Sequence, residues 1–250
     1  MEIPTSSLLS VMSSIDESDL LEPRFTRPDR AIPDIICAKF RTNMSEVVSG
    51  FDGACYFHGT RTSDPASFKE RGIWPLADMV GEIFGQLRDL VQERVTDMDW
   101  AGFRERLESG KIDDDGAFLY RLEVDDPLIG GGPYARLVRA MHLSPGSAGS
   151  DFLWSPPEIV DDIISALEAD TSIAIGSDYL ASTQACLVKF RCAAVSTNDV
   201  ESAMWYLYYR SFGIEPGRNA DSGGFDGAGE RVPAESVVSV EVLEPDMLPG

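Results

Sequence analysis

Hydrophobic residues recur at intervals of three and four between residues 76 and 95, which is the pattern of a helix with one apolar face. The repeating positions are Met79, Val80, Ile83, Phe84, Leu87, Leu90 and Val91. A shorter helix is expected from Asp97 to Leu107. Gly110 is placed to end it, because glycine readily adopts the left-handed conformation that closes many helices.

A third helix is predicted to open at Ser155-Pro156-Pro157-Glu158. Serine is a preferred N-cap, proline is favoured at the first helical position, and a glutamate three residues after the cap completes a capping box. The buried face of this helix would comprise Ile159, Val160, Ile163, Ile164 and Leu167. A fourth helix is expected from about Asn198 to Phe212, and we assign its aromatic residues mainly to the core.

Three segments have the composition and alternation of β-strands. The first, residues 54–58, alternates so that Tyr56 and His58 share one face, while Cys55 and Phe57 share the other, which we take as the core face. The other two segments are residues 187–192 and 236–243. Weaker strand signals lie near residues 118 and 152.

These strands are separated by helices and long irregular stretches, without the regular strand–helix alternation that a doubly wound sheet requires. The sequence therefore predicts the α+β class. Residues 13–35 are acidic and rich in proline and show no sustained period. We expect an N-terminal arm or extension over residues 1–50 and a single α+β domain over residues 51–250.

The charge of the chain is strongly unbalanced, with 21 Lys and Arg against 42 Asp and Glu and a formal net charge of −21. Such a surface repels phosphate backbones and anionic membranes, since binding to both depends on Lys and Arg. No apolar stretch approaches the roughly 18 to 20 residues of a membrane span, and the N-terminus lacks a secretory signal pattern. We expect a soluble, cytoplasmic protein that binds neither nucleic acid nor membrane; the sequence leaves its oligomeric state open.

Metal and phosphate-loop chemistry find little support in the sequence. The four cysteines are irregularly spaced, and His58 and His142 are the two histidines of the chain, so we predict reduced thiols and no metal site. No glycine-rich dinucleotide or nucleotide fingerprint follows a strand, and Gly130-Gly131-Gly132-Pro133 is expected to form a turn. His142 is expected to end an element and make a local hydrogen bond.

The most informative residues are Tyr56-Phe57-His58-Gly59-Thr60-Arg61, at the end of the first strand. Together with Gly72-Ile73-Trp74-Pro75-Leu76, this segment resembles the opening of the ADP-ribosyltransferase superfamily. In that family the NAD site starts with a strand ending in His-Gly-Thr or His-Gly-Ser, and a Gly-Ile or Gly-Leu turn follows. The resemblance implies a split mixed or antiparallel sheet with peripheral helices, and NAD as the substrate.

The resemblance also implies roles for these residues. Breaking the bond between nicotinamide and ribose passes through a transition state with oxocarbenium character, so the site must hold the amide and place negative charge near the sugar. Gly59 could clamp the nicotinamide amide with its backbone, because no side chain blocks the approach. His58 could hydrogen-bond a ribose hydroxyl, and Thr60 or Arg61 could contact the dinucleotide.

Members with a His-Tyr-Glu pattern add a later aromatic that stacks on nicotinamide and a glutamate that polarises the ribose 2′-hydroxyl. That glutamate usually opens a short strand before the last long one. Glu230 in Glu230-Arg231-Val232-Pro233-Ala234-Glu235 resembles it, with Glu235 as the substitute. Tyr179 is the preferred aromatic; Phe152 and Trp154 are the alternatives.

The resemblance thus implies an ADP-ribosyltransferase that acts on a protein or small-molecule acceptor, as a host-directed toxin or effector or a phage-conflict factor. A rival hypothesis is a non-catalytic acidic protein that keeps the fold and captures a basic partner by charge. Each candidate residue also has a structural interpretation. His58 could cap a strand end, Glu230 could belong to an acidic turn, and Tyr179 could be a core residue.

Overall fold

The described part of the chain forms one antiparallel sheet with helices around it. The computed structural model describes residues 33–34, 37–38, 41–112, 118, 132–143, 153–211 and 224–244. The five strands are β1 (Ala54–Thr62), β2 (Tyr134–Arg136), β3 (Gln184–Cys192), β4 (Gly224–Asp226) and β5 (Val237–Val242). Their order is β4-β2-β1-β3-β5, and every pair is antiparallel. The predicted α+β class is confirmed.

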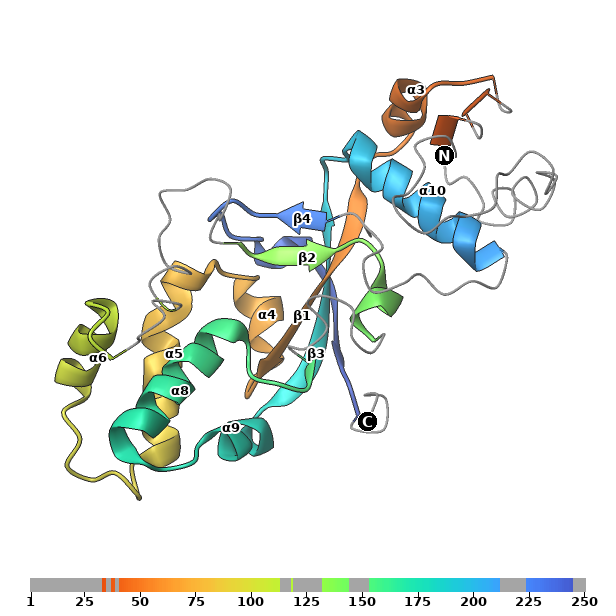
Figure 1. The fold of residues 1–250 in the computed structure, drawn as a ribbon. Helices are drawn as coiled ribbons and strands as arrows, with labels where there is room; N and C mark the ends of the chain where they lie inside the picture. Colours follow the sequence, from red (N-terminus) through yellow and green to blue (C-terminus); the bar gives the residue numbers. More distant parts are fainter. Residues whose placement is uncertain are drawn as a thin grey trace.

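The sheet is continuous on one side of β1 and nearly interrupted on the other. β1 and β3 pair along their whole length, from Ala54↔Cys192 to Thr62↔Gln184. β1 and β2 share a single pair, Phe57↔Arg136. Figure 1 shows the β2–β4 pair crossing β1 steeply, whereas β3 and β5 run beside it. The short β1–β2 contact, which we call the β1–β2 junction, is where the candidate site residues meet.

One face of the sheet carries the core formed by Tyr56, Cys186, Val188 and Phe190, and the loop residues Ile73 and Val232 pack against it. The rings of Tyr56 and Phe190 stack with their centroids 5.8 Å apart. The choice of Cys55 and Phe57 as the core face is therefore wrong. Tyr56 is 3% exposed, whereas Cys55 and Phe57 are half-buried.

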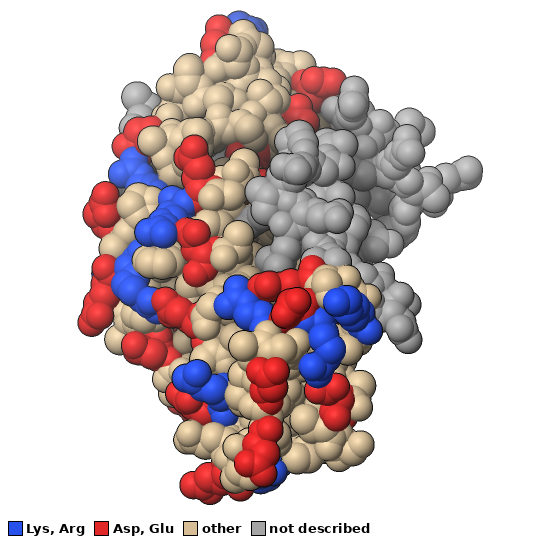
Figure 2. Space-filling model, turned by 90° about the vertical axis from the view of Figure 1, so that its left-hand side faces the viewer, with Lys and Arg blue, Asp and Glu red and all other residues tan. Residues whose placement is uncertain are grey.

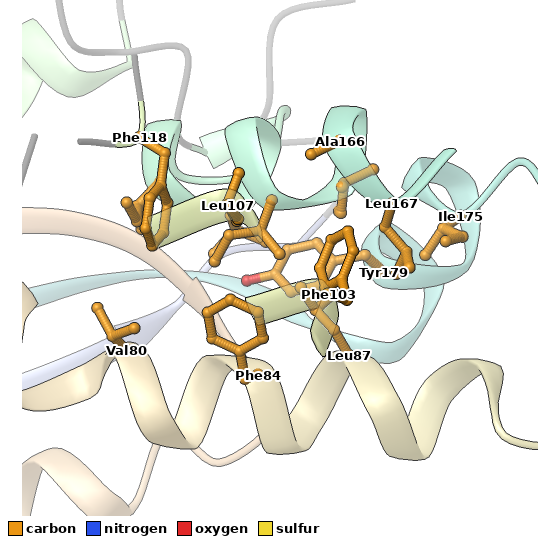
Figure 3. Packing of buried hydrophobic residues seen from close by; sticks show 14 of the residues in the cluster. Val80, Phe84, Leu87, Phe103, Leu107, Phe118, Ala166, Leu167, Ile175 and Tyr179 are labelled. Atoms are coloured by element: carbon orange, nitrogen blue, oxygen red, sulfur yellow. The ribbon is translucent and has the colours of Figure 1, made fainter. Parts of the chain in front are cut away.

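A second core lies between the helices α5 (Leu76–Val91), α6 (Trp100–Glu108), α8 (Glu158–Thr171) and α9 (Gly176–Ser182). Figure 3 shows Val80, Phe84 and Leu87 of α5 pointing toward Phe103 and the residues of α8. The apolar stripes predicted for α5 and α8 supply these contacts. Both helices, and the shorter α6 between them, are confirmed.

Two further helices pack against each other at the opposite end of the molecule. They are α3 (Met44–Ser49) and α10 (Thr197–Ser211), and they share a small apolar cluster around Val200 and Met204. The hydroxyl of Tyr56 donates to the Asp199 carboxylate over 2.8 Å, and both residues are buried. This bond ties α10 to β1 two residues before His58.

Several local expectations differ from the structure. Helix α8 begins at Glu158 with Pro157 as its N-cap, so Ser155 does not cap it. Phe118 is helical and Leu153 lies in a 3-10 turn, so neither supports a strand there, and Phe152 lies outside the described residues. β1 continues through Gly59 to Thr62.

The surface that carries α5, α6 and α8 has acidic and basic side chains interspersed, as Figure 2 shows. Arg104 pairs with Glu108 one turn away, and Arg106 of α6 reaches Asp170 of α8 at 2.7 Å. These pairs neutralise part of the net negative charge locally. Within the described residues, no helix is long and apolar enough to span a bilayer.

We predict that Leu87→Ala lowers the free energy of unfolding by about 2–5 kcal/mol, because Leu87 is fully buried in the helical core and its removal leaves a cavity. Urea denaturation followed by circular dichroism measures this loss. Arg88→Ala on the same helix is the control, since an exposed side chain away from such features changes stability by only about 0.5 kcal/mol. Equal effects of the two substitutions would contradict the assignment of the core.

Candidate functional site

His58 is held at the β1–β2 junction by a hydrogen bond to the neighbouring strand. Its Nδ1 lies 2.7 Å from the carbonyl oxygen of Tyr134. A carbonyl only accepts, so Nδ1 carries the hydrogen and Nε2 has a free lone pair when the ring is neutral. Burial of the ring lowers the pKa of His58, although the bond to Tyr134 opposes this. His58 is therefore a neutral acceptor at physiological pH.

His142, which follows β2, makes a corresponding hydrogen bond back to the backbone of β1. It closes the 3-10 helix η2 (Arg139–His142) that follows β2, and its Nε2 lies 2.8 Å from the carbonyl oxygen of Phe57. The ring is 3% exposed, and burial, with a weaker effect of nearby positive charge, lowers the pKa of His142 to about 4. The two histidines thus link β1 and the β2–η2 segment in both directions.

Gly59 is required by this arrangement. A Cβ at position 59 would lie 2.8 Å from Nδ1 of His142, closer than real side chains approach. Nδ1 itself is buried and has no hydrogen-bond partner. The glycine of the His-Gly-Thr motif therefore makes room for an imidazole, in addition to any role in contacting a ligand.

The remaining motif residues differ in their surroundings. Thr60 is half-buried and pairs with Cys186 of β3. The Arg61 guanidinium donates to the carbonyl oxygens of Leu180 and Thr183 at 3.0 and 2.9 Å, and to the Leu153 carbonyl. Arg61 therefore anchors the end of α9 to β1, and few of its donors remain for a dinucleotide.

Tyr179 does not reach this region. It lies on α9, is 2% exposed, and belongs to the helical core with Ile175 and Leu167, as Figure 3 shows. Burial raises the pKa of its hydroxyl to about 12. The structure thus agrees with the core interpretation of Tyr179, and stacking on a ligand would require α9 to move.

The aromatic residue whose backbone lies at the junction is Tyr134, which sequence reasoning missed. Tyr134 is 53% exposed, and its own carbonyl accepts the bond from His58. Asp226 of β4 is its direct partner in the sheet. Partial burial and the charge of Asp226 raise the pKa of the Tyr134 hydroxyl. Three adjacent strands thus carry the neutral imidazole of His58 (β1), the neutral phenol of Tyr134 (β2) and the carboxylate of Asp226 (β4).

Glu230 is exposed in the turn that follows β4. The backbone N–H groups of Gly227 and Gly229 donate to the carbonyls of Pro133 and Gly132, so this turn lies against the residues that precede Tyr134. On its other side, Val232 forms a β-bridge with Ile73. Glu230 is thus held near the β2–β4 edge, whereas Glu235 lies in η4 (Ala234–Ser236), next to β5.

Metal ligands and disulfides do not define the site. All four cysteines are free. Among the described residues, no group of three or more His, Cys, Asp or Glu side chains could hold a metal ion. Two shallow hollows lie on the helices, one lined by residues including Asp97, Arg106 and Asp170 and the other by residues including Arg94 and Asp178, and neither includes His58.

Comparison with known proteins adds no family to this geometry. No family model, no curated protein and no solved structure matches the chain. The residues at the β1–β2 junction are therefore the basis for a functional proposal.

We predict that Gly59→Ala destabilises the protein by about 1–3 kcal/mol, because the added methyl group overlaps His142. In the double variant Gly59→Ala/His142→Ala the overlap is gone, so the combined loss should be smaller than the sum of the single losses. Chemical denaturation of the four proteins measures this coupling. Strict additivity would show that the two residues do not touch.

Stability should fall as the pH is lowered from 6.5 toward 4. The unfolded His142 protonates near pH 6.5 and the folded one near pH 4, so the unfolded state binds more protons between these values. The full contribution is about 3 kcal/mol. In His142→Gln, which keeps a side-chain N–H donor but does not titrate, urea denaturation should show a smaller loss over this range. The same loss in both proteins would contradict the buried neutral imidazole.

Proposed function

We propose that the protein is an NAD-dependent ADP-ribosyltransferase that cleaves the nicotinamide–ribose bond and transfers ADP-ribose to a protein or small-molecule acceptor. The observation that supports this most is the hydrogen bond from His58 to the Tyr134 backbone, which joins β1 to the strand that pairs with Asp226 and lies against the Glu230 turn. The resemblance of the His58-Gly59-Thr60 segment implied a histidine, an aromatic residue and a carboxylate. We further propose that the sheet, split at the β1–β2 junction, is of the ADP-ribosyltransferase type.

The geometry suggests a role for each group. Nδ1 of His58 is occupied by the Tyr134 carbonyl, so Nε2 is the atom that can accept a hydrogen bond from a ribose hydroxyl. The exposed Tyr134 ring offers a surface on which the nicotinamide can stack. Because its hydroxyl stays protonated, Tyr134 adds no charge beside the sugar.

A carboxylate near the ribose would stabilise the positive charge that develops as nicotinamide leaves. Glu230 remains our first candidate because its turn is held against the start of β2 and its side chain is exposed. Asp226 is the second, because it is the direct sheet partner of Tyr134. Glu235 becomes a weaker substitute than Asp226, since it follows the Val232 bridge and lies beside β5.

A non-catalytic acidic binding protein is the second candidate function. It is supported by the net charge of −21 and by the exposed carboxylates of Glu230 and Glu235, which form no ion pair with a described residue. Such a surface suits electrostatic capture of a basic partner. The two functions differ in their dependence on His58, because a charge-driven interface does not need a neutral imidazole.

We expect the purified protein to release nicotinamide from NAD, and His58→Ala to reduce the rate by at least about 10²–10³-fold, the usual cost of losing one preorganised contact. Proton NMR of free nicotinamide, with and without acceptors from a cell lysate, measures release and separates transfer from hydrolysis. Glu230→Gln and Asp226→Asn, tested separately, identify the carboxylate by the larger loss.

Asp89→Asn on α5 is the matched control, since its carboxylate is exposed and remote from β1. It should leave the rate unchanged. Absence of release in the wild-type protein under every condition, together with salt-sensitive binding of a basic protein, would overturn the transferase proposal in favour of the binding protein.

A further inference from the structure

One row of side chains crosses the three strands β2, β1 and β3 on the sheet face opposite Tyr56. Phe57 of β1 is paired with Arg136 of β2 and with Lys189 of β3, and Arg136 is paired with Gly224 of β4. Directly opposed residues of antiparallel strands project to the same face. The Lys189 ammonium lies 5.9 Å from the centre of the Phe57 ring, which confirms their common side. We call Arg136, Phe57 and Lys189 the cation row.

Neither cation of this row has an acidic partner among the residues that the structure describes. Lys189 contacts the Phe57 ring, and Arg136 makes no hydrogen bond or ion pair with another described residue. Most other described arginines are engaged. Those in ion pairs are Arg71, Arg88, Arg94, Arg104, Arg106, Arg139, Arg191 and Arg231. In a chain with twice as many acidic as basic residues, two neighbouring unpaired cations are unexpected.

Arg136 is the residue at which the lack of a counter-charge is unfavourable. The side chain is half-buried in the sheet, and burial lowers the pKa of its guanidinium. Removing a charge from water without a counter-charge is unfavourable. An anion between the two side chains would offset this cost, and charge-assisted hydrogen bonds to a guanidinium are stronger than neutral ones.

There is room for such an anion next to Arg136. Gly224, its partner on β4, has no side chain, and among the described atoms a Cβ there would meet nothing closer than the Ala135 carbonyl oxygen at 3.5 Å. Arg136 and Lys189 lie two strand spacings apart, which is roughly 10 Å between backbones. Two long side chains can converge from this separation on an anion with two charged groups, whereas a single phosphate would engage one of them.

We propose that Arg136 and Lys189 bind a diphosphate group over the Phe57 ring. The diphosphate could be inorganic pyrophosphate or the diphosphate of a nucleotide. The inference goes beyond the proposed transferase activity and does not require it, because anion binding can be measured in a protein that leaves NAD intact.

Isothermal titration calorimetry of the full chain with inorganic pyrophosphate at low ionic strength tests the proposal. We expect saturable binding by the wild-type protein and a dissociation constant at least tenfold higher in Arg136→Gln and in Lys189→Gln. Arg88→Gln, which removes the same charge from an exposed position on α5, should change it less than twofold. Inorganic phosphate should bind at least tenfold more weakly than pyrophosphate.

Titration with ADP distinguishes the two sources of the diphosphate. Tighter binding of ADP than of pyrophosphate assigns the site to a nucleotide, and equal or weaker binding assigns it to the free anion. Lys189→Gln lies on the half-buried edge of the row, so it tests the site even if Arg136→Gln fails to fold. Absence of binding by the wild-type protein, or equal binding by the wild type and both variants, would overturn the proposal.

Discussion

Two imidazole rings hold the β1–β2 junction together. The backbone ladder between these strands is one residue pair long, too short to fix their relative position. His58 donates to the Tyr134 carbonyl and His142 donates to the Phe57 carbonyl, so each ring replaces a backbone donor that the separating strands no longer supply. Because burial keeps both rings neutral, each has one N–H group to donate and one lone pair left.

The position of the candidate site follows from this constraint. Where β1 and β2 diverge, Tyr134 is exposed and Asp226 and the Glu230 turn are carried along with β2. A fully paired sheet would satisfy the Tyr134 carbonyl with a backbone N–H, whereas here Nδ1 of His58 donates to it. Arg136, two residues along β2 from Tyr134, lies beside Phe57 and forms no ion pair with a described residue. The interrupted ladder therefore leaves polar groups unpaired in a chain whose other described arginines are mostly paired.

Periodicity predicted the helices well and the short strands poorly. The stripes of α5 and α8 extend over several turns, so their burial could be inferred from spacing. β2 and β4 have three residues each, too few to show alternation, and they exist because they pair with each other. The expected local bond of His142 is in fact a bond to Phe57, 85 residues away.

Site residues that belong to one contiguous sequence motif could be predicted, whereas those that come together only through strand pairing could not. His58 and Gly59 belong to one contiguous motif and were found from sequence. Tyr134 and Asp226 join them through strand pairing, which no short segment encodes. Tyr179 was predicted as the stacking aromatic because it lies in sequence between the motif and Glu230, but its side chain is buried in the helical core. Arg61 has the polarity of a ligand contact, yet its donors bind backbone carbonyls that become neighbours only in the fold.

The most direct test of this account is nitrogen-15 NMR of the imidazole rings, which is simple to interpret because the chain has two histidines. The account predicts two neutral rings at pH 7 in opposite tautomers, with hydrogen on Nδ1 of His58 and on Nε2 of His142. Added NAD should shift Nε2 of His58. Rapid tautomer exchange in both rings, or a His58 resonance that does not respond to NAD, would contradict the central claim that the β1–β2 junction is a preorganised ligand site.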